Sequence, residues 1–67
     1  MPSFPETVTF EDVACEAATD AAILVVIDGE KHWFPKSQVD DDSEVWKRGD
    51  QGKLVVSAWI AKQKGLD

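Results

Sequence analysis

Cysteine is almost missing from this chain of 67 residues, since Cys15 stands alone. One cysteine cannot form a disulfide within the chain, and small secreted domains usually need such bridges, so a reducing, cytoplasmic setting is expected. The first residues include prolines and lack the apolar stretch of a signal peptide. The longest uninterrupted apolar run, Ala21–Ile27, is too short to span a bilayer, so no membrane association is expected.

Clusters of residues that support catalysis or metal binding are also lacking. The one histidine, His32, has no nucleophile near it in sequence, and a metal site would need two or three more ligands. Cys15 has acidic neighbours and lies among small apolar residues, which is typical of a buried side chain rather than a reactive thiol. The acidic run 40–44 lacks the spacing of a calcium-binding loop. We therefore predict a non-enzymatic protein with no cofactor and no metal.

Basic residues are scarce relative to acidic ones. Seven lysines and arginines stand against thirteen aspartates and glutamates, so the formal net charge is −6. Such a surface is repelled by nucleic-acid phosphates and anionic lipid, and it suits a basic protein partner or mimicry of a polyanion. The simpler alternative is that the negative charge keeps a small protein soluble.

The length allows one domain, residues 1–67, with a proline-broken lead-in over residues 1–6 that is expected to be loosely ordered. Ordering the chain costs on the order of 100 kcal/mol. Nearly all of the large apolar residues must therefore be buried, and no roomy cavity is expected.

The stretch 22–39 organises the rest of the chain. Two apolar segments flank Asp28-Gly29, a pair that favours a two-residue type I′ turn because both residues adopt positive φ. This turn places Ile27 opposite Glu30. Because side chains alternate between the two faces of a sheet, one face of the hairpin is mostly apolar and is predicted to form the core, while the second face has both apolar and charged residues. The predicted core face holds Ile23, Val25, Ile27, His32 and Phe34, and the second face holds Leu24, Val26, Lys31 and Trp33.

Flanking segments complete a β domain. Thr7–Ala18 is predicted as a strand with a bulge near Glu11–Asp12, and a helix with an apolar stripe is the alternative. Residues 36–39 either extend the hairpin or begin a loop. Glu44–Arg48 and Lys53–Val56 are predicted as the arms of a second hairpin.

The carboxyl end reads as a short helix. Ser57 has the character of an N-cap, and Gly65 that of the residue that ends a helix, with Leu66 as its apolar neighbour. Together these elements predict a mainly β fold, a small SH3-like barrel or a rolled antiparallel sheet of four or five strands with a short C-terminal helix.

Two stretches carry a resemblance to known proteins. An apolar strand with an Asp-Gly turn leads into WFPKSQ at Trp33–Gln38, and the chain closes with WIAKQKGL at Trp59–Leu66. This pattern resembles a group of small uncharacterised bacterial and phage proteins over about two-thirds of the chain. The resemblance implies a phage or mobile-element setting, and an anti-defence role would follow from it by analogy alone.

Three tryptophans in a chain without tyrosine are the sharpest signal. One interpretation has two of them closing the core, with Trp59 lying over Leu24 and Trp33. The other leaves one or two exposed as anchors of a protein interface, where tryptophan is enriched. We predict a small acidic binding or inhibitory module that docks a protein partner. The predicted partner-binding residues are Trp33, Trp46, Asp40, Asp41, Asp42 and Glu44.

The alternative function is binding of single-stranded nucleic acid on a small β-barrel. Lysines interleaved with aromatic residues supply the charge and the stacking surface that such binding needs. The candidate residues for this function are Lys31, Trp33, Lys36, Trp46 and Lys47. The net charge opposes it, so protein docking is the first prediction.

Overall fold

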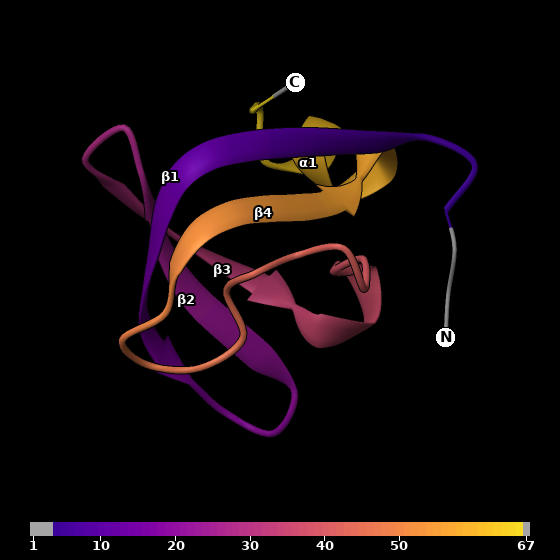
Figure 1. Cartoon of the computed structure of the whole chain (residues 1–67). Coiled ribbons are helices and arrows are strands. Elements are labelled where there is room, and N and C mark those ends of the chain that lie inside the picture. Colours follow the sequence, from indigo (N-terminus) through magenta and orange to yellow (C-terminus); the bar gives the residue numbers. More distant parts are fainter. Residues whose placement is uncertain (1–3, 67) are drawn as a thin grey trace.

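The computed structural model describes residues 4–66 as a bent antiparallel sheet with a short helix at its carboxyl end (Figure 1). The sheet order is β3-β2-β1-β4, and its open edges are not joined into a closed barrel. The predicted fold class is therefore confirmed in its rolled-sheet form with four strands. The elements are β1 (Thr7–Ala18), β2 (Ala22–Ile27), β3 (Glu30–Pro35), β4 (Gln51–Ser57) and α1 (Ala58–Gln63).

Strand β1 serves both halves of the roll. Its residues 7–10 and 13–14 pair with β4, and its residues 14–18 pair with β2. The register with β4 shifts between Phe10 and Val13, where Asp12 has a φ of 55°. The predicted strand and its bulge are confirmed, and the helix alternative is wrong. A bulge bends and twists its strand, which fits the curve of β1 in Figure 1.

The β2–β3 hairpin has the predicted register, with Ile27 opposite Glu30 and Ile23 opposite Phe34. Asp28 and Gly29 have φ values of 52° and 82°, as both central residues of a type I′ turn require. Because the turn fixes the register, it also decides which side chains face inward. Four of the five predicted core-face residues are buried, and His32 is half-buried.

One cluster of buried apolar side chains fills the roll. Phe34 and Ile23 come from the hairpin, Leu54 and Val56 come from β4, and Ile60 comes from the helix. Phe10, Trp46 and Leu66 are partly buried and pack against this cluster. Every strand therefore contributes to a single core.

The connection between β3 and β4 differs from the prediction. It begins with a 3-10 turn, η1 (Lys36–Gln38), and an isolated bridge joins Val39 to Val56. Residues 44–48 are irregular, so the predicted strand Glu44–Arg48 is wrong. The alternation of apolar and polar residues there is real, since Val45 is buried. The Glu44 N–H bonds to the Lys53 carbonyl of β4, but the next N–H groups with partners, those of Trp46 and Lys47, bond to the Asp50 side chain instead of a strand.

Helix α1 has the predicted caps. The Ser57 hydroxyl accepts a hydrogen bond from the Ile60 N–H at 3.2 Å. At the other end Gly65 has a φ of 71°, and the Leu66 N–H donates to the Ala61 carbonyl at 2.9 Å, as in a Schellman motif. Within residues 4–66, no helix has the length and apolar character needed to cross a membrane.

The lead-in is described only from Phe4, so the prediction of loose order for residues 1–3 lies outside the described residues. The last residue of the lead-in is tied to the helix, because the Glu6 carbonyl accepts a hydrogen bond from the Ala58 N–H at 3.0 Å.

Candidate functional site

The loop of residues 40–50, here called the acidic loop, is built onto the edge of β4. The Asp40 N–H donates to the Val55 carbonyl and the Glu44 N–H donates to the Lys53 carbonyl, both at 2.8 Å. Between them, the buried Ser43 hydroxyl donates to the Val55 carbonyl and accepts from the Val55 N–H, again at 2.8 Å. One side chain thus takes the place of a paired strand residue, and the loop is held without becoming a strand.

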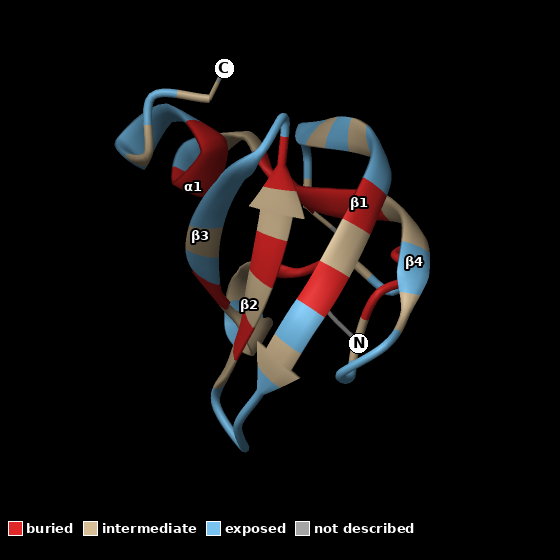
Figure 2. Ribbon diagram, turned by 90° about the vertical axis from the view of Figure 1, so that its left-hand side faces the viewer, coloured by how far each residue is buried: buried red, intermediate tan, exposed pale blue. Residues whose placement is uncertain are grey.

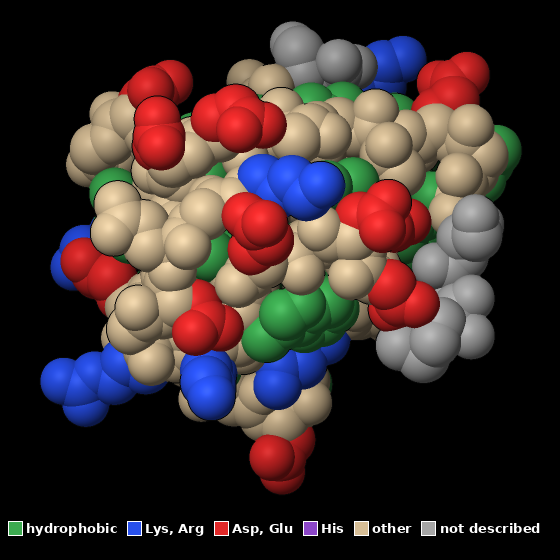
Figure 3. Space-filling model, in the orientation of Figure 1, with side chains coloured by type: hydrophobic (Ala, Val, Ile, Leu, Met, Phe, Trp, Pro, Cys, Tyr) green, Lys and Arg blue, Asp and Glu red, His purple; other side chains and the backbone are tan. Residues whose placement is uncertain are grey.

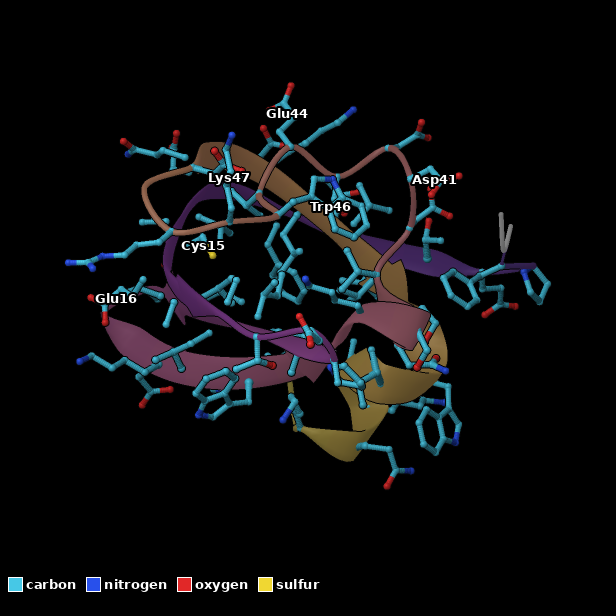
Figure 4. All side chains as sticks on the ribbon, turned by 90° about the horizontal axis from the view of Figure 1, so that it is seen from below. Cys15, Glu16, Asp41, Glu44, Trp46 and Lys47 are labelled. Atoms are coloured by element: carbon cyan, nitrogen blue, oxygen red, sulfur yellow. The ribbon has the colours of Figure 1, made fainter. Side chains whose placement is uncertain are left out.

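Trp46 and Asp50 hold the second half of the acidic loop. The Trp46 indole N–H donates to the Ser43 carbonyl at 2.9 Å, and the ring is half-buried against the core. The Asp50 carboxylate accepts the backbone N–H groups of Trp46 and Lys47 at 2.9 and 3.1 Å. These two hydrogen bonds lower the pKa of Asp50, because they favour the ionised carboxylate. In Figure 4 the Trp46 side chain lies within the curve of this loop.

The predicted acidic residues differ in how far they are engaged. Asp40 accepts the Asp42 N–H at 3.0 Å, and Glu44 accepts the Lys53 N–H at 2.9 Å. Asp41 and Asp42 are exposed, and within residues 4–66 neither carboxylate has a hydrogen-bond or salt-bridge partner. Figure 3 shows the face with this loop, where carboxylates outnumber basic groups. Two of the four carboxylates are therefore entirely free to meet a partner.

Gly52 makes room for Glu44. It has a φ of 152°, and a Cβ built there would lie 2.5 Å from the Glu44 Oε1 atom. The Glu44 side chain therefore lies flat over the start of β4, which strengthens the attachment of the acidic loop.

Trp33 is not brought together with Trp46. It lies on the outer face of β3, opposite Leu24 of β2, and its side chain is 46% exposed. Trp46 instead packs against the core from the acidic loop. The six predicted partner-binding residues thus fall into a group of five on the loop, with Trp33 apart.

The five residues of the nucleic-acid alternative are spread over three elements. Lys31 and Trp33 belong to β3, Lys36 belongs to η1, and Trp46 and Lys47 belong to the loop. The Lys31 ammonium is 3.1 Å from the Glu16 carboxylate, so part of its charge is already neutralised. No basic stripe of the kind that tracks a phosphate backbone is formed by this set.

The two side chains considered for chemistry are both drawn inward. Burial raises the pKa of the Cys15 thiol, which donates to the Ala17 carbonyl at 3.3 Å. The buried Nε2 atom of His32 has no hydrogen-bond partner within the described chain and lies 3.8 Å from a Glu30 carboxylate oxygen. Among residues 4–66, no three potential ligands from His, Cys, Asp and Glu are grouped to hold a metal ion.

Sequence reasoning missed a groove beside Trp59. The groove lies between the lead-in, Phe4–Glu6, and the start of α1, with Gln38 and Ser57 in its lining. Trp59 is 60% exposed there, and the structure places it beside the lead-in rather than over Leu24 and Trp33. Nothing in the sequence signals this groove, because it depends on how the lead-in crosses the helix.

No family model, curated protein or solved structure matches this chain.

Proposed function

We propose that this protein is a non-enzymatic binding or inhibitory module that docks a basic protein partner through the acidic loop. The observation that carries the proposal is the fixed display of Asp41 and Asp42. Their carboxylates have no internal partner, while the backbone beneath them is held by Ser43 and the edge of β4. Charge-assisted hydrogen bonds from lysine or arginine side chains are what such exposed carboxylates accept best.

The rigidity of the acidic loop supports docking. A loop that must be ordered on binding loses conformational entropy, and this cost is reduced when the free protein already holds the bound conformation. Trp46 acts here as a support, since its indole N–H bonds within the loop and its ring rests on the core. Exposed carboxylates on such a support speed association with a basic surface and give it orientation.

The proposal extends to the setting of the protein. We place it in the cytoplasm, supported by its single buried cysteine. We further assign the rolled sheet to the SH3-like kind, supported by its size and strand content. A phage or mobile-element origin, with a role against host defence, rests on the sequence resemblance and is part of the same proposal.

Capture from a bacterial lysate, quantified by mass spectrometry, tests the proposal. The Asp41→Asn, Asp42→Asn double variant removes two charges and keeps the shape of both side chains. The matched control, Asp20→Asn with Glu11→Gln, removes two charges from exposed positions outside the loop. A basic protein captured by the wild type and the control, and at least about tenfold less by the double variant, is the expected result. Equal capture by all three chains, or capture of no basic protein, overturns it.

A further inference from the structure

The outer side of the β1–β2–β3 sheet carries a group of neighbouring apolar side chains. The strand register sets Ala17, Leu24 and Trp33 in one row. Ala14 and Val26 lie in the next row and Pro35 follows at the end of β3. Five of these six residues are half-buried, and the sixth, Trp33, is exposed. These residues are here called the outer apolar face: Ala14, Ala17, Leu24, Val26, Trp33 and Pro35.

No described element covers the outer apolar face. Figure 2 shows β1, β2 and β3 side by side toward the viewer, and α1 lies beside them rather than in front. The buried residues of α1, Ile60 and Ala61, belong to the core on the other side of the sheet. The largest contiguous apolar patch on a monomer, typically about 300–600 Å², is often a binding surface.

The outer apolar face is also close to electrically neutral. Lys31 lies on this face opposite Val26, and its ammonium reaches across β2 to the Glu16 carboxylate of β1 at 3.1 Å, so the two opposite charges offset each other. This contrasts with the chain as a whole, which carries a net charge of −6. A basic partner is drawn to the acidic loop, and it finds no excess of negative charge on the outer apolar face.

We propose that the outer apolar face docks a second copy of this chain. Two molecules of charge −6 repel each other, and they approach with the least repulsion through a neutral surface. A two-fold axis through this face sets apolar rows against apolar rows and brings each Lys31–Glu16 pair toward its counterpart, where the opposite charges are complementary. The acidic loops are attached to β4, at the opposite end of the strand order from β3.

Face-to-face packing is favoured over joining of the sheets at the free edge of β3. The outward edge of this strand presents Lys31 and Pro35, and proline has no N–H to donate. A charged residue and a proline are the features that natural sheets use to prevent edge pairing. The buried surface must therefore come from the face.

The size of the face sets the strength of association. Three strands of six residues cover roughly 300 Å² in projection, which is less than the roughly 800 Å² that each partner buries in a standard complex. Self-association through this face is therefore expected to be weak.

Sedimentation velocity from about 10 μM to 1 mM tests the self-association. The weight-average mass of the wild type is expected to rise toward that of a dimer. Trp33→Lys places a charge in the apolar contact and is expected to weaken the association at least about tenfold. The matched control is Trp59→Lys, because Trp59 is also exposed, at 60% against 46% for Trp33, and lies outside the face. It is expected to leave the association within about twofold of the wild type.

The indole N–H resonances of the three tryptophans give a second readout that needs no variant. Dilution is expected to move the Trp33 resonance, while those of Trp46 and Trp59 stay in place. A wild type that remains monomeric up to about 1 mM overturns the proposal, as does a dimer that Trp59→Lys disrupts and Trp33→Lys does not. Neither result bears on capture through Asp41 and Asp42, so the proposed function is tested separately.

Discussion

The acidic loop and the outer apolar face are held in place by different kinds of interaction. The acidic loop has little regular structure, and short polar side chains fix it: the Ser43 hydroxyl bonds to Val55, and the Asp50 carboxylate bonds to two N–H groups. The outer apolar face is fixed by strand register, which the Asp28-Gly29 turn sets between β2 and β3 and the pairing of β1 with β2 completes. An irregular segment can thus be as well anchored as a strand, provided that its backbone groups find side-chain partners.

The difference also separates two kinds of surface on one small molecule. Unpaired carboxylates are gathered over the edge of β4, whereas the exposed apolar area lies across β1, β2 and β3. Under the two proposals each surface binds a different kind of partner, and we expect that each can be changed without disturbing the other. The following predictions test this separation, from the largest effect to the smallest.

The largest expected effect is on stability and separates Trp46 from Trp33. Trp46→Ala removes a ring packed against the core and the hydrogen bond to Ser43, so we expect the free energy of unfolding to fall by about 2–4 kcal/mol. Trp33→Ala removes an exposed ring, and we expect a loss of less than about 1 kcal/mol. Urea unfolding of both variants measures the difference. Equal losses would mean that Trp46 is no more a support than Trp33.

A smaller effect on stability is expected when the pH is lowered, because the Asp50 carboxylate that holds the acidic loop becomes protonated. The folded-state pKa of Asp50 is below its ordinary value of 3.8, so its ionised form stabilises the fold above that value. This contribution is lost as the pH falls through the lowered pKa. The difference in Tm between wild type and Asp50→Asn should therefore be largest near about pH 6 and shrink toward about pH 2.

The control for the acid experiment is Asp20→Asn, since the Asp20 carboxylate is exposed and accepts no recorded hydrogen bond within residues 4–66. Its Tm difference from the wild type should stay small throughout. A difference for Asp50→Asn that does not change with pH would show that the carboxylate does not hold the loop through its charge.

The smallest expected signal is binding of single-stranded nucleic acid. A labelled single-stranded DNA should show no saturable binding at about 50 mM salt, because the net charge of the chain is −6 and Lys31 is already paired. Fluorescence anisotropy with a salt titration measures this. Tight binding with a steep salt dependence, lost in a Lys31→Ala, Lys47→Ala variant, would favour the nucleic-acid alternative over protein docking.

Local signals in the sequence predicted the sheet well. The Asp-Gly turn predicted the register of β2 and β3, and the caps at Ser57 and Gly65 predicted the bounds of α1. The bulge near Asp12 explained why the inward-facing apolar residues of β1 change phase along the strand. Each of these features is decided by residues only a few positions apart. They therefore remain visible without knowledge of the tertiary structure.

The acidic loop and the grouping of the site were not predictable in the same way. Residues 44–48 alternate like a strand, but the Asp50 carboxylate and the Ser43 hydroxyl occupy the backbone groups that a strand partner would need. The separation of Trp33 from Trp46 follows from the roll of the sheet, which depends on contacts between distant segments. The sequence therefore put six residues into one predicted site, and the structure brings Trp46 and the four acidic residues together on the acidic loop and leaves Trp33 apart.

A paired comparison of two variants tests the account most directly. The loop variant is the double variant Asp41→Asn, Asp42→Asn, and the face variant is Trp33→Lys. Each should be assayed for capture of a basic lysate protein and for self-association by sedimentation. The account predicts opposite results: the loop variant loses capture and still self-associates, and the face variant loses self-association and still captures. If either variant loses both properties while remaining folded, the two surfaces are not independent and the account is contradicted.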